Sequence, residues 1–453
     1  MSEGGDIEET LARARLLVAK GEDEAAKAQY VAVLGRDPTH FAALNELGAL
    51  AYASGHRSAA RTAYAQAVQC HPREKVARVN LGNLLVEDNE SDTALAHYRA
   101  ALDIDPEFAS AHQGIARVLS ERGDETAAES HWRKGFTGHA MVTKRYRGAG
   151  KAVPVLLLVS VRGGNIPTEQ WLDDRIFAVT ALYAEYHDTA EPLPPHDVVL
   201  NAIGDADLCG PALVAANKIL TRTKAPVINP PALVEITGRA ANAKRLAALD
   251  GVVAPRTDVL SKAAILAVRD LRFPLLLRAP GFHTGQHFYR IEDRDGLAAA
   301  VAKLPGDDVL AIQYLDARGA DGRARKYRAM IVDGALYPLH LAISDDWKVH
   351  YFTSAMAADE AHRREEQRFL RGMPAVLGAR AMIGLTGIAQ TLGLDYGGID
   401  FGLDQDGSLL LFEANATMVV NPPDPDPMWD YRRAPIARVL EAMRRLVLAR
   451  AGR

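Results

Sequence analysis

Two acidic residues and an asparagine near the C-terminal end have the types and spacing to bind a divalent cation. Asp400 lies in one segment with strand character, and Glu413 and Asn415 lie in the next. Two carboxylates on facing strands repel each other unless a cation lies between them or one of them is protonated. Ligands that are all oxygen favour a hard cation such as Mg²⁺ carried on nucleotide phosphates. The alternative is an exposed hairpin whose acids face water.

The dipeptide between these segments predicts how they pair. Asp406-Gly407 is typical of a two-residue hairpin loop, in which both central residues need a positive φ. If Gln405 pairs with Ser408, Asp400 lies directly opposite Glu413, with Cβ atoms about 4.5–5.5 Å apart. Residues two apart on a strand share a face, so Asn415 is expected beside Glu413.

The segment Gly397–Asn415 resembles the metal-binding signature of the ATP-grasp superfamily, an Asp on one strand and Glu-x-Asn on the next. The spacing is similar to that of the D-alanine:D-alanine ligase and glutathione synthetase types. The resemblance implies ATP and Mg²⁺ as cofactors. It also implies that Asp400 and Glu413 bridge two magnesium ions and that Asn415 binds the second.

A second segment resembles the strand of this family that ends in a phosphate-binding basic residue. Phe273–Gly281 places Arg278 where the family usually has Lys, so a rigid fork replaces a mobile point charge. Gly281, Thr284 and Gly285 match the small flexible loop that folds over the ATP phosphates, where glycines let backbone N–H groups approach. By itself this segment is also compatible with a plain surface hairpin.

A third segment, Ala311–Asp316, resembles the hinge strand that binds the adenine edge through its backbone and the ribose hydroxyls through an acid. The resemblance assigns cofactor binding to Gln313, Tyr314, Leu315 and Asp316. The usual hinge Glu is missing from this sequence.

A fourth segment, Lys326–Gly334, resembles the strand that carries an arginine toward the γ-phosphate. Strand alternation puts Lys326, Arg328 and Met330 on one face. The resemblance gives Arg328, together with Arg278, the role of holding the charge that develops during phosphoryl transfer. An edge-strand arginine in water is the plainer alternative.

Upstream, Arg239 and Lys244 both lie where the family places its first phosphate-contacting basic residue. The sequence leaves the choice between them open.

In the chain, the elements that must position these residues come after a repeat array. Four columns of residues recur every 34 positions along the N-terminal part. They are a proline column (Pro38, Pro72, Pro106), a glycine column (Gly21, Gly55, Asn89, Gly123), an alanine column (Ala26, Ala60, Ala94, Ala128) and an aromatic column (Tyr30, Tyr64, Tyr98, Trp132). This period resembles the tetratricopeptide repeat, a stack of helical hairpins. We expect about four units in an all-α solenoid over residues 1–147.

Such an array can present a concave surface to a peptide or protein partner. Alternatively, it covers the next domain or joins two copies into a homodimer. No unit has a run of Lys or Arg that would capture a carboxylate.

After residue 150 the pattern changes to buried strands that alternate with helical segments, which predicts an α/β unit. Strands are expected at Val153–Val161, Asp197–Ile203 and Ala225–Asn229, and several shorter strands follow them. With the resemblance, this predicts a multidomain chain: an α/β pre-ATP-grasp domain at 151–240 and an α+β ATP-grasp domain at 241–453, whose lid covers about 256–315.

Composition narrows the function classes. The 53 basic and 57 acidic residues are well mixed and give a formal net charge of −4, so no basic field indicates nucleic acid. The two cysteines exclude a disulfide scaffold or a cysteine-rich metal site. The N-terminus lacks signal-peptide features and no run of about 18 apolar residues occurs, so we expect a cytoplasmic protein that does not bind a membrane.

The resemblance implies an ATP- and Mg²⁺-dependent ligase. It would join a small-molecule or peptide carboxylate to an amine or other nucleophile through an acyl phosphate, releasing ADP and phosphate. The alternatives are a kinase on the same fold and a repeat scaffold with a nucleotide-regulated, weakly active second part.

Overall fold

The computed structural model describes residues 3–282, 285–351 and 354–453. Thr284, which was expected in a phosphate-binding loop, lies outside the described residues. The chain divides into two compact units. The first contains residues 1–150 and 186–190, and the second contains residues 151–185 and 191–453.

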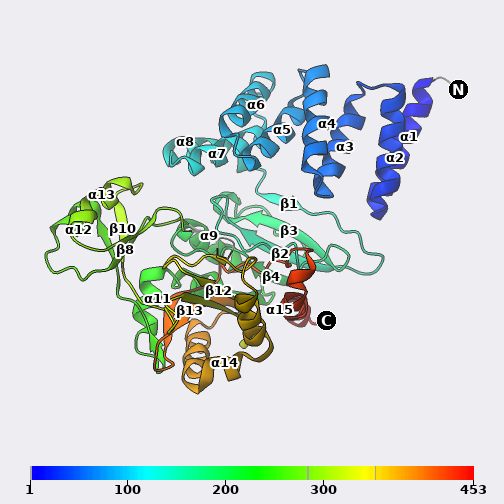
Figure 1. Cartoon of the computed structure of the whole chain (residues 1–453). Coiled ribbons are helices and arrows are strands. Elements are labelled where there is room, and N and C mark those ends of the chain that lie inside the picture. The colour runs from blue at the N-terminus through cyan, green and yellow to red at the C-terminus, as the bar shows by residue number, and fades with distance from the viewer. Residues whose placement is uncertain (1–2, 283–284, 352–353) are drawn as a thin grey trace. The chain divides into compact units, whose positions relative to one another are not determined.

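The first unit is a row of helical hairpins, coloured blue to cyan in Figure 1, in which consecutive helices pack in pairs. The helices are α1 (Glu3–Lys20), α2 (Asp23–Arg36), α3 (Phe41–Ala53), α4 (Arg57–Cys70), α5 (Lys75–Glu87), α6 (Ser91–Ile104), α7 (Ala109–Glu121) and α8 (Glu125–Phe136), and the short strand β1 (Met141–Thr143) follows them. The expected array of helical pairs is therefore present.

Two of the repeated columns have direct structural reasons. The glycine column supplies the left-handed residue between the two helices of each pair, with φ of 74° at Gly21, 80° at Gly55, 63° at Asn89 and 81° at Gly123. The aromatic column fills the space between pairs: Tyr98 is only 1% exposed, and its ring lies where a Cβ on Gly82 or Gly114 would be.

The second unit begins with a parallel sheet. Its strands are β2 (Val153–Val159), β3 (Phe177–Tyr183), β4 (Val198–Asn201) and β5 (Val227–Ile228), in the order β3-β2-β4-β5. The three expected strands are present in shortened form. The sequence did not reveal β3, because a helical segment was expected between the first two strands. Instead, Phe177, Val179 and Ala181 alternate inward along a strand.

A second, antiparallel sheet has the order β7-β10-β8-β9. Its strands are β7 (Thr257–Ser261), β8 (Leu275–Arg278), β9 (Phe288–Ile291) and β10 (Asp308–Gln313), and α12 (Lys262–Ala267) and α13 (Asp295–Lys303) pack against them. Buried Leu277, Leu297 and Val309 share one small core there. This substructure spans nearly the same residues as the expected lid.

The third sheet carries the predicted cation-binding residues, in the order β12-β11-β13-β14-β6. Its strands are β6 (Val252–Val253), β11 (Ala324–Val332), β12 (Ala335–Ser344), β13 (Tyr396–Leu403) and β14 (Leu409–Asn415). On one face the Tyr327 ring lies 5.1 Å from Phe369 of α14 (Glu360–Leu392) and 5.4 Å from Phe401. Strand alternation leaves the opposite face for Arg328 and Asp400.

The remaining elements of this unit connect or cover the sheets. They are η1 (Ala184–Tyr186), α9 (Gly210–Leu220), α10 (Pro231–Glu235), α11 (Arg239–Leu246), η3 (Pro427–Trp429) and α15 (Asp430–Arg450). The domain boundary expected between residues 240 and 241 lies within α11. This helix packs against β14 of the third sheet.

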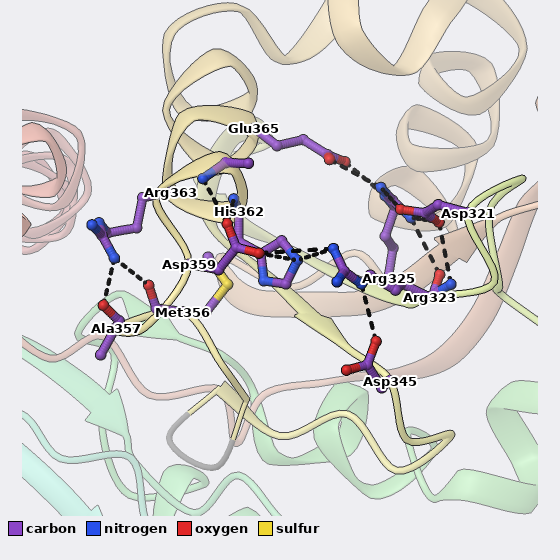
Figure 2. A network of polar contacts seen from close by, with 11 residues as sticks. Asp321, Arg323, Arg325, Asp345, Met356, Ala357, Asp359, His362, Arg363 and Glu365 are labelled. Carbon is purple, nitrogen blue, oxygen red and sulfur yellow. Dashed lines mark hydrogen bonds and ion pairs between the residues drawn. The ribbon is translucent and has the colours of Figure 1, made fainter.

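A polar network fixes the start of β11 to α14 (Figure 2). Arg325 donates to both oxygens of Glu365 at 2.7 and 3.0 Å and to both oxygens of Asp321 at 2.9 and 3.0 Å. Arg323 contacts Asp345 and His362 at 3.0 Å each. These contacts hold the strand that carries Arg328 against its supporting helix.

Among the described residues, one helix is long and apolar enough to cross a membrane, namely α14. A core helix of a soluble protein can be equally long and apolar. This helix is interrupted by non-helical backbone at Gly372 and Gly378, and it buries Phe369, Leu370 and Leu385.

Candidate functional site

The β13–β14 hairpin places Asp400 opposite Glu413, as the sequence predicted. The pairing arises from a longer loop and a bulge rather than from a two-residue turn. Next to the turn, Leu403 pairs with Leu409, and the loop is longer than two residues: Gly407 N–H donates to the Asp404 carbonyl at 3.0 Å. Only Gly407, with φ 80°, has the positive φ that was expected of both Asp406 and Gly407.

A bulge then restores the predicted pairing. Between Asp400 and Phe401 the register shifts by one residue, because Phe412 has no partner across the hairpin. The predicted two-residue turn is therefore wrong, and the predicted Asp400–Glu413 pair is present because the longer loop and the bulge compensate. A bulge of this kind aims a side chain away from the regular pleat.

Asp400 is held by two cations of the neighbouring strand β11. Arg328 lies directly across from it and donates from Nε to Oδ1 at 2.5 Å and from Nη2 to Oδ2 at 2.8 Å. Lys326 Nζ donates to Oδ2 at 3.1 Å. Burial alone would raise the pKa of the Asp400 carboxyl, but the charges of Arg328 and Lys326 outweigh burial and hold that pKa well below its usual range.

Glu413 is contacted by an arginine from outside the third sheet. Arg239, the first residue of α11, brings Nη2 to 2.7 Å from Glu413 Oε1 and donates from Nη1 to Asp207 Oδ2 at 2.9 Å. The helix is held there because Asn242 Nδ2 donates to the carbonyl of Ala414 at 2.5 Å. Arg239 is 9% exposed at its side chain, so this is a buried ion pair.

Asn415 lies beside Glu413 on the same face of β14. Its Nδ2 donates to Glu413 Oε1 at 2.9 Å, and its Oδ1 accepts from the backbone N–H and hydroxyl of Thr417 at 3.0 and 2.8 Å. The structure therefore brings together Asp400, Glu413 and Asn415, the three residues that the sequence grouped.

Arg278 belongs to the second sheet. It ends β8, donates from Nη2 to the Phe282 carbonyl, and has its guanidinium 5.5 Å from the centre of the Phe288 ring. Burial, followed by the charge of Arg239, lowers the pKa of Arg278. The charges of Arg239 and Glu413 both act on Arg278, although no described hydrogen bond or ion pair joins it to the acids.

Two glycines that follow Arg278 adopt left-handed backbone conformations. Gly281 has φ 77° and Gly285 has φ 74°. Lys348 Nζ donates to the Gly285 carbonyl at 2.5 Å, which ties this loop to the segment after β12.

The predicted hinge residues make local contacts. Gln313 exchanges hydrogen bonds with the backbone of Arg256 at 2.8 and 3.1 Å, and the carboxylate of Asp316 accepts three bonds from the guanidinium of Arg318 at 2.5–3.1 Å. Tyr314 lies under the guanidinium of Arg290 at 4.3 Å, and Leu315 is partly buried. The structure does not join these four residues to the acids by any described contact.

Of the two upstream candidates, Arg239 contacts Glu413, whereas Lys244 is exposed on the same helix. Sequence reasoning also missed two members of the cluster. Strand alternation placed Lys326 on the face of Arg328, which was a usable signal. Asp207 follows β4 in a loop, about 200 residues before Glu413, and no local pattern connects the two.

The donor set is small for a metal site. Within the described ranges, no three His, Cys, Asp or Glu side chains gather into a metal-binding group. The oxygens at this face come from two carboxylates and one amide, and each group is already engaged: both carboxylates contact cationic side chains, and Asn415 Oδ1 accepts two bonds from Thr417.

Comparison with known proteins bears on the first unit. The family described as "Tetratricopeptide repeat" matches residues 11–75 and 79–133. No curated protein matches the chain.

Among solved structures, MamA is 22% identical over 29% of this chain and 78% of its own, with a TM-score of 0.27. A tetratricopeptide repeat protein from Parabacteroides merdae is 24% identical over 28% of this chain and 51% of its own, also with a TM-score of 0.27. YrrB, described as a TPR protein with an unusual peptide-binding site, is 22% identical over 29% and 69%, with a TM-score of 0.26. On the family match, residues 11–75 and 79–133 of this chain form an array of tetratricopeptide repeats.

Proposed function

We propose that the second unit is an ATP- and Mg²⁺-dependent ligase that resembles the ATP-grasp type. One observation carries the proposal: cationic side chains from three separate segments converge on a face that offers two carboxylates and an amide. Arg278 ends β8, Arg239 begins α11, and Arg328 and Lys326 lie on β11. Cations for phosphates beside oxygen ligands for a metal are what a metal-nucleotide site needs.

The arginines fit an anionic ligand. Among the described residues, the Nε atoms of Arg239 and Arg278 are buried and have no hydrogen-bond partner. A buried guanidinium with unused donors is costly, and phosphate oxygens would accept from it. Gly281 and Gly285 follow Arg278 in the chain and would let backbone N–H groups approach the same phosphates.

The oxygen donors fit Mg²⁺. Asp400, Glu413 and Asn415 would hold it, and the carboxylate and amide oxygens match the ligands that this ion prefers. Bound there, Mg²⁺ would neutralise charge on the β- and γ-phosphates.

In the proposed reaction, a carboxylate oxygen of the substrate attacks the γ-phosphorus of ATP. The bond between that phosphorus and the bridging oxygen breaks, and ADP leaves with the electron pair. An amine or other nucleophile then attacks the acyl carbon of the acyl phosphate, and phosphate leaves. Arg328 and Arg278 would hold the charge that accumulates on the transferred group.

The repeat array of the first unit supports a second role in the same chain. Tetratricopeptide repeats commonly serve as protein-interaction scaffolds. We infer that the array binds a peptide or protein partner while the second unit carries the chemistry.

The test is an ADP-release assay with pairs of candidate acids and amines. Release that needs both substrates supports a ligase. Release with a single acceptor that keeps the phosphate would identify a kinase on the same fold. Nucleotide binding without turnover would favour a nucleotide-regulated scaffold.

Two variants test the site directly. Asp400→Asn and Glu413→Ala should each lower Mg²⁺-dependent turnover by at least about 100-fold, the usual scale for a lost transition-state contact. Asp406→Asn is a matched control, because it removes a charge from the same hairpin at the turn and leaves an acceptor for the Ser408 N–H. Equal turnover in Asp400→Asn and the control would count against the proposed site.

A further inference from the structure

The acids of the proposed metal site are already neutralised by the chain itself. Arg328 and Lys326 contact Asp400, and Arg239 contacts both Glu413 and Asp207. Arg278 and Asp205 also act electrostatically on these groups, so four positive side chains oppose four negative ones. The Asp400 side chain is 5% exposed and that of Arg239 is 9% exposed, so water can replace little of what these contacts supply.

A divalent cation that arrives alone meets two obstacles. It would add two positive charges to a cluster that is already balanced. It would also have to displace the bidentate Arg328–Asp400 pair or the Arg239–Glu413 pair. Displacing the first pair leaves the buried Arg328 guanidinium without its carboxylate, and displacing the second leaves Arg239 with Asp207 alone. Losing one partner of a buried pair is strongly unfavourable.

A nucleotide removes both obstacles. Its phosphates bring the negative charge that the added metal requires. Their oxygens also accept hydrogen bonds from the displaced guanidinium groups, in the planar bidentate geometry that arginine favours.

We propose that Arg239, Arg328 and Lys326 keep the metal-binding carboxylates occupied in the nucleotide-free protein, so that Mg²⁺ binds only together with nucleotide phosphates. This inference rests on the proposed function, and it assigns an order to binding at that site. The arginines act as exchangeable partners: they hold the carboxylates first and the phosphates afterwards.

The first experiment measures metal binding to the intact chain with Mn²⁺, which takes the same oxygen ligands. Water-proton relaxation distinguishes protein-bound Mn²⁺ from Mn²⁺ bound to free nucleotide, because the protein tumbles more slowly. We expect Mn²⁺ to bind the wild-type protein at least about tenfold more tightly in the presence of a non-hydrolysable ATP analogue, a difference of about 1.4 kcal/mol.

The second experiment weakens the hold on one carboxylate. Arg239→Gln removes the guanidinium that contacts Glu413 and Asp207, so nucleotide-free Mn²⁺ affinity should rise about tenfold while affinity for the ATP analogue falls. Lys244→Gln is the matched control, since it removes the same charge from an exposed position on the same helix. If Arg239→Gln fails to fold by circular dichroism, Lys326→Gln tests the same exchange at Asp400.

The outcomes separate the two proposals. Tight, nucleotide-independent Mn²⁺ binding by the wild-type protein that disappears in Asp400→Asn would overturn the inference and leave the proposed function intact. Equal nucleotide-free affinities in Arg239→Gln, Lys326→Gln and Lys244→Gln would also overturn it. If no complex forms with the ATP analogue in the wild-type protein, both proposals fail.

Discussion

The Arg328–Asp400 pair is a buried charge pair of the candidate site, and its effect on stability is separable from its chemistry. Arg328→Met leaves the Asp400 carboxylate with Lys326 as its remaining cation, so we expect a loss of about 3 kcal/mol in the free energy of unfolding. The triple variant Lys326→Met/Arg328→Met/Asp400→Leu removes all three charges and should recover most of this loss. Urea unfolding followed by circular dichroism measures both.

The same pair of variants also tests the geometry. If the triple variant is less stable than Arg328→Met, these side chains do not form a mutually dependent group. Recovery of stability without recovery of nucleotide binding would fit side chains that are retained for the site rather than for the fold.

A histidine pair in the first unit predicts a pH dependence. His112 Nε2 lies 2.9 Å from the Pro106 carbonyl and must carry the proton there, so its Nδ1 accepts from His131 Nδ1, 2.8 Å away. Burial, followed by the charge of His112, lowers the pKa of His131. The charges of Lys134 and Arg99 also lower the pKa of His131.

The sign follows from linkage. Because the folded-state pKa of His131 is depressed, the unfolded chain binds the proton first as pH falls below about 6.5. Stability of the array is therefore present above that pH and is lost below it. His131→Gln keeps a donor for His112 but does not titrate, so its urea midpoint should fall less than that of the wild-type protein between pH 7.5 and 5.5. Parallel midpoints would contradict the assignment.

At the scale of elements, the helical repeat depends on glycines that admit an aromatic ring. A Cβ at Gly82 would lie 2.6 Å from the Tyr98 ring, so Gly82→Ala should destabilise the array by about 1–3 kcal/mol through overpacking. Gly35→Ala is the matched control: it lies in α2 with nothing within 4 Å of the added Cβ, and it should stabilise by about 0.5–1 kcal/mol. Thermal unfolding of both variants gives the comparison.

The two Asp-Gly turns show what local sequence can and cannot determine. At Asp333-Gly334 both residues have positive φ, 49° and 76°, and Val332 pairs with Ala335 in a two-residue loop. At Asp406-Gly407 the same dipeptide forms a longer loop, followed by the bulge at Phe412. The dipeptide predicts a turn, but neighbouring strands decide the register, because they bury one face and not the other.

The candidate site was predictable where strand alternation or a motif places its residues. It was not predictable where residues distant in sequence come together. Asp400, Glu413 and Asn415 share a hairpin, and Lys326 and Arg328 share one face of β11. Asp207 meets Arg239 only because the loop after β4 and the start of α11 come together in the folded unit. No residue near either one in sequence indicates that contact.

At the scale of the whole molecule, the two units differ in what the sequence reveals. Four columns of residues with a single period identify the repeat array. The period is regular because each helical hairpin mainly contacts its neighbours. The second unit has three sheets whose strands come from distant parts of the chain. Alternation and turn signals identified most of its strands, but β3 and the order of the sheets depend on contacts that local patterns do not contain.

This division leads to a prediction about where a nucleotide acts. A ligand that binds only the folded second unit stabilises that unit by mass action, by about 2.7 kcal/mol at a concentration 100 times its dissociation constant. Hydrogen exchange of the full chain with and without a Mg²⁺-bound ATP analogue should therefore show protection confined to peptides of residues 151–453. The strongest effect is expected in β8, β11 and the β13–β14 hairpin, because these elements carry the arginines and the acids. The helices of residues 3–136 should exchange at unchanged rates.

Equal protection in both units would mean that nucleotide binding couples them, and protection of the array alone would place the nucleotide outside the proposed site. Glu413→Ala supplies the control, since it should abolish the protection in the second unit without altering exchange in the array.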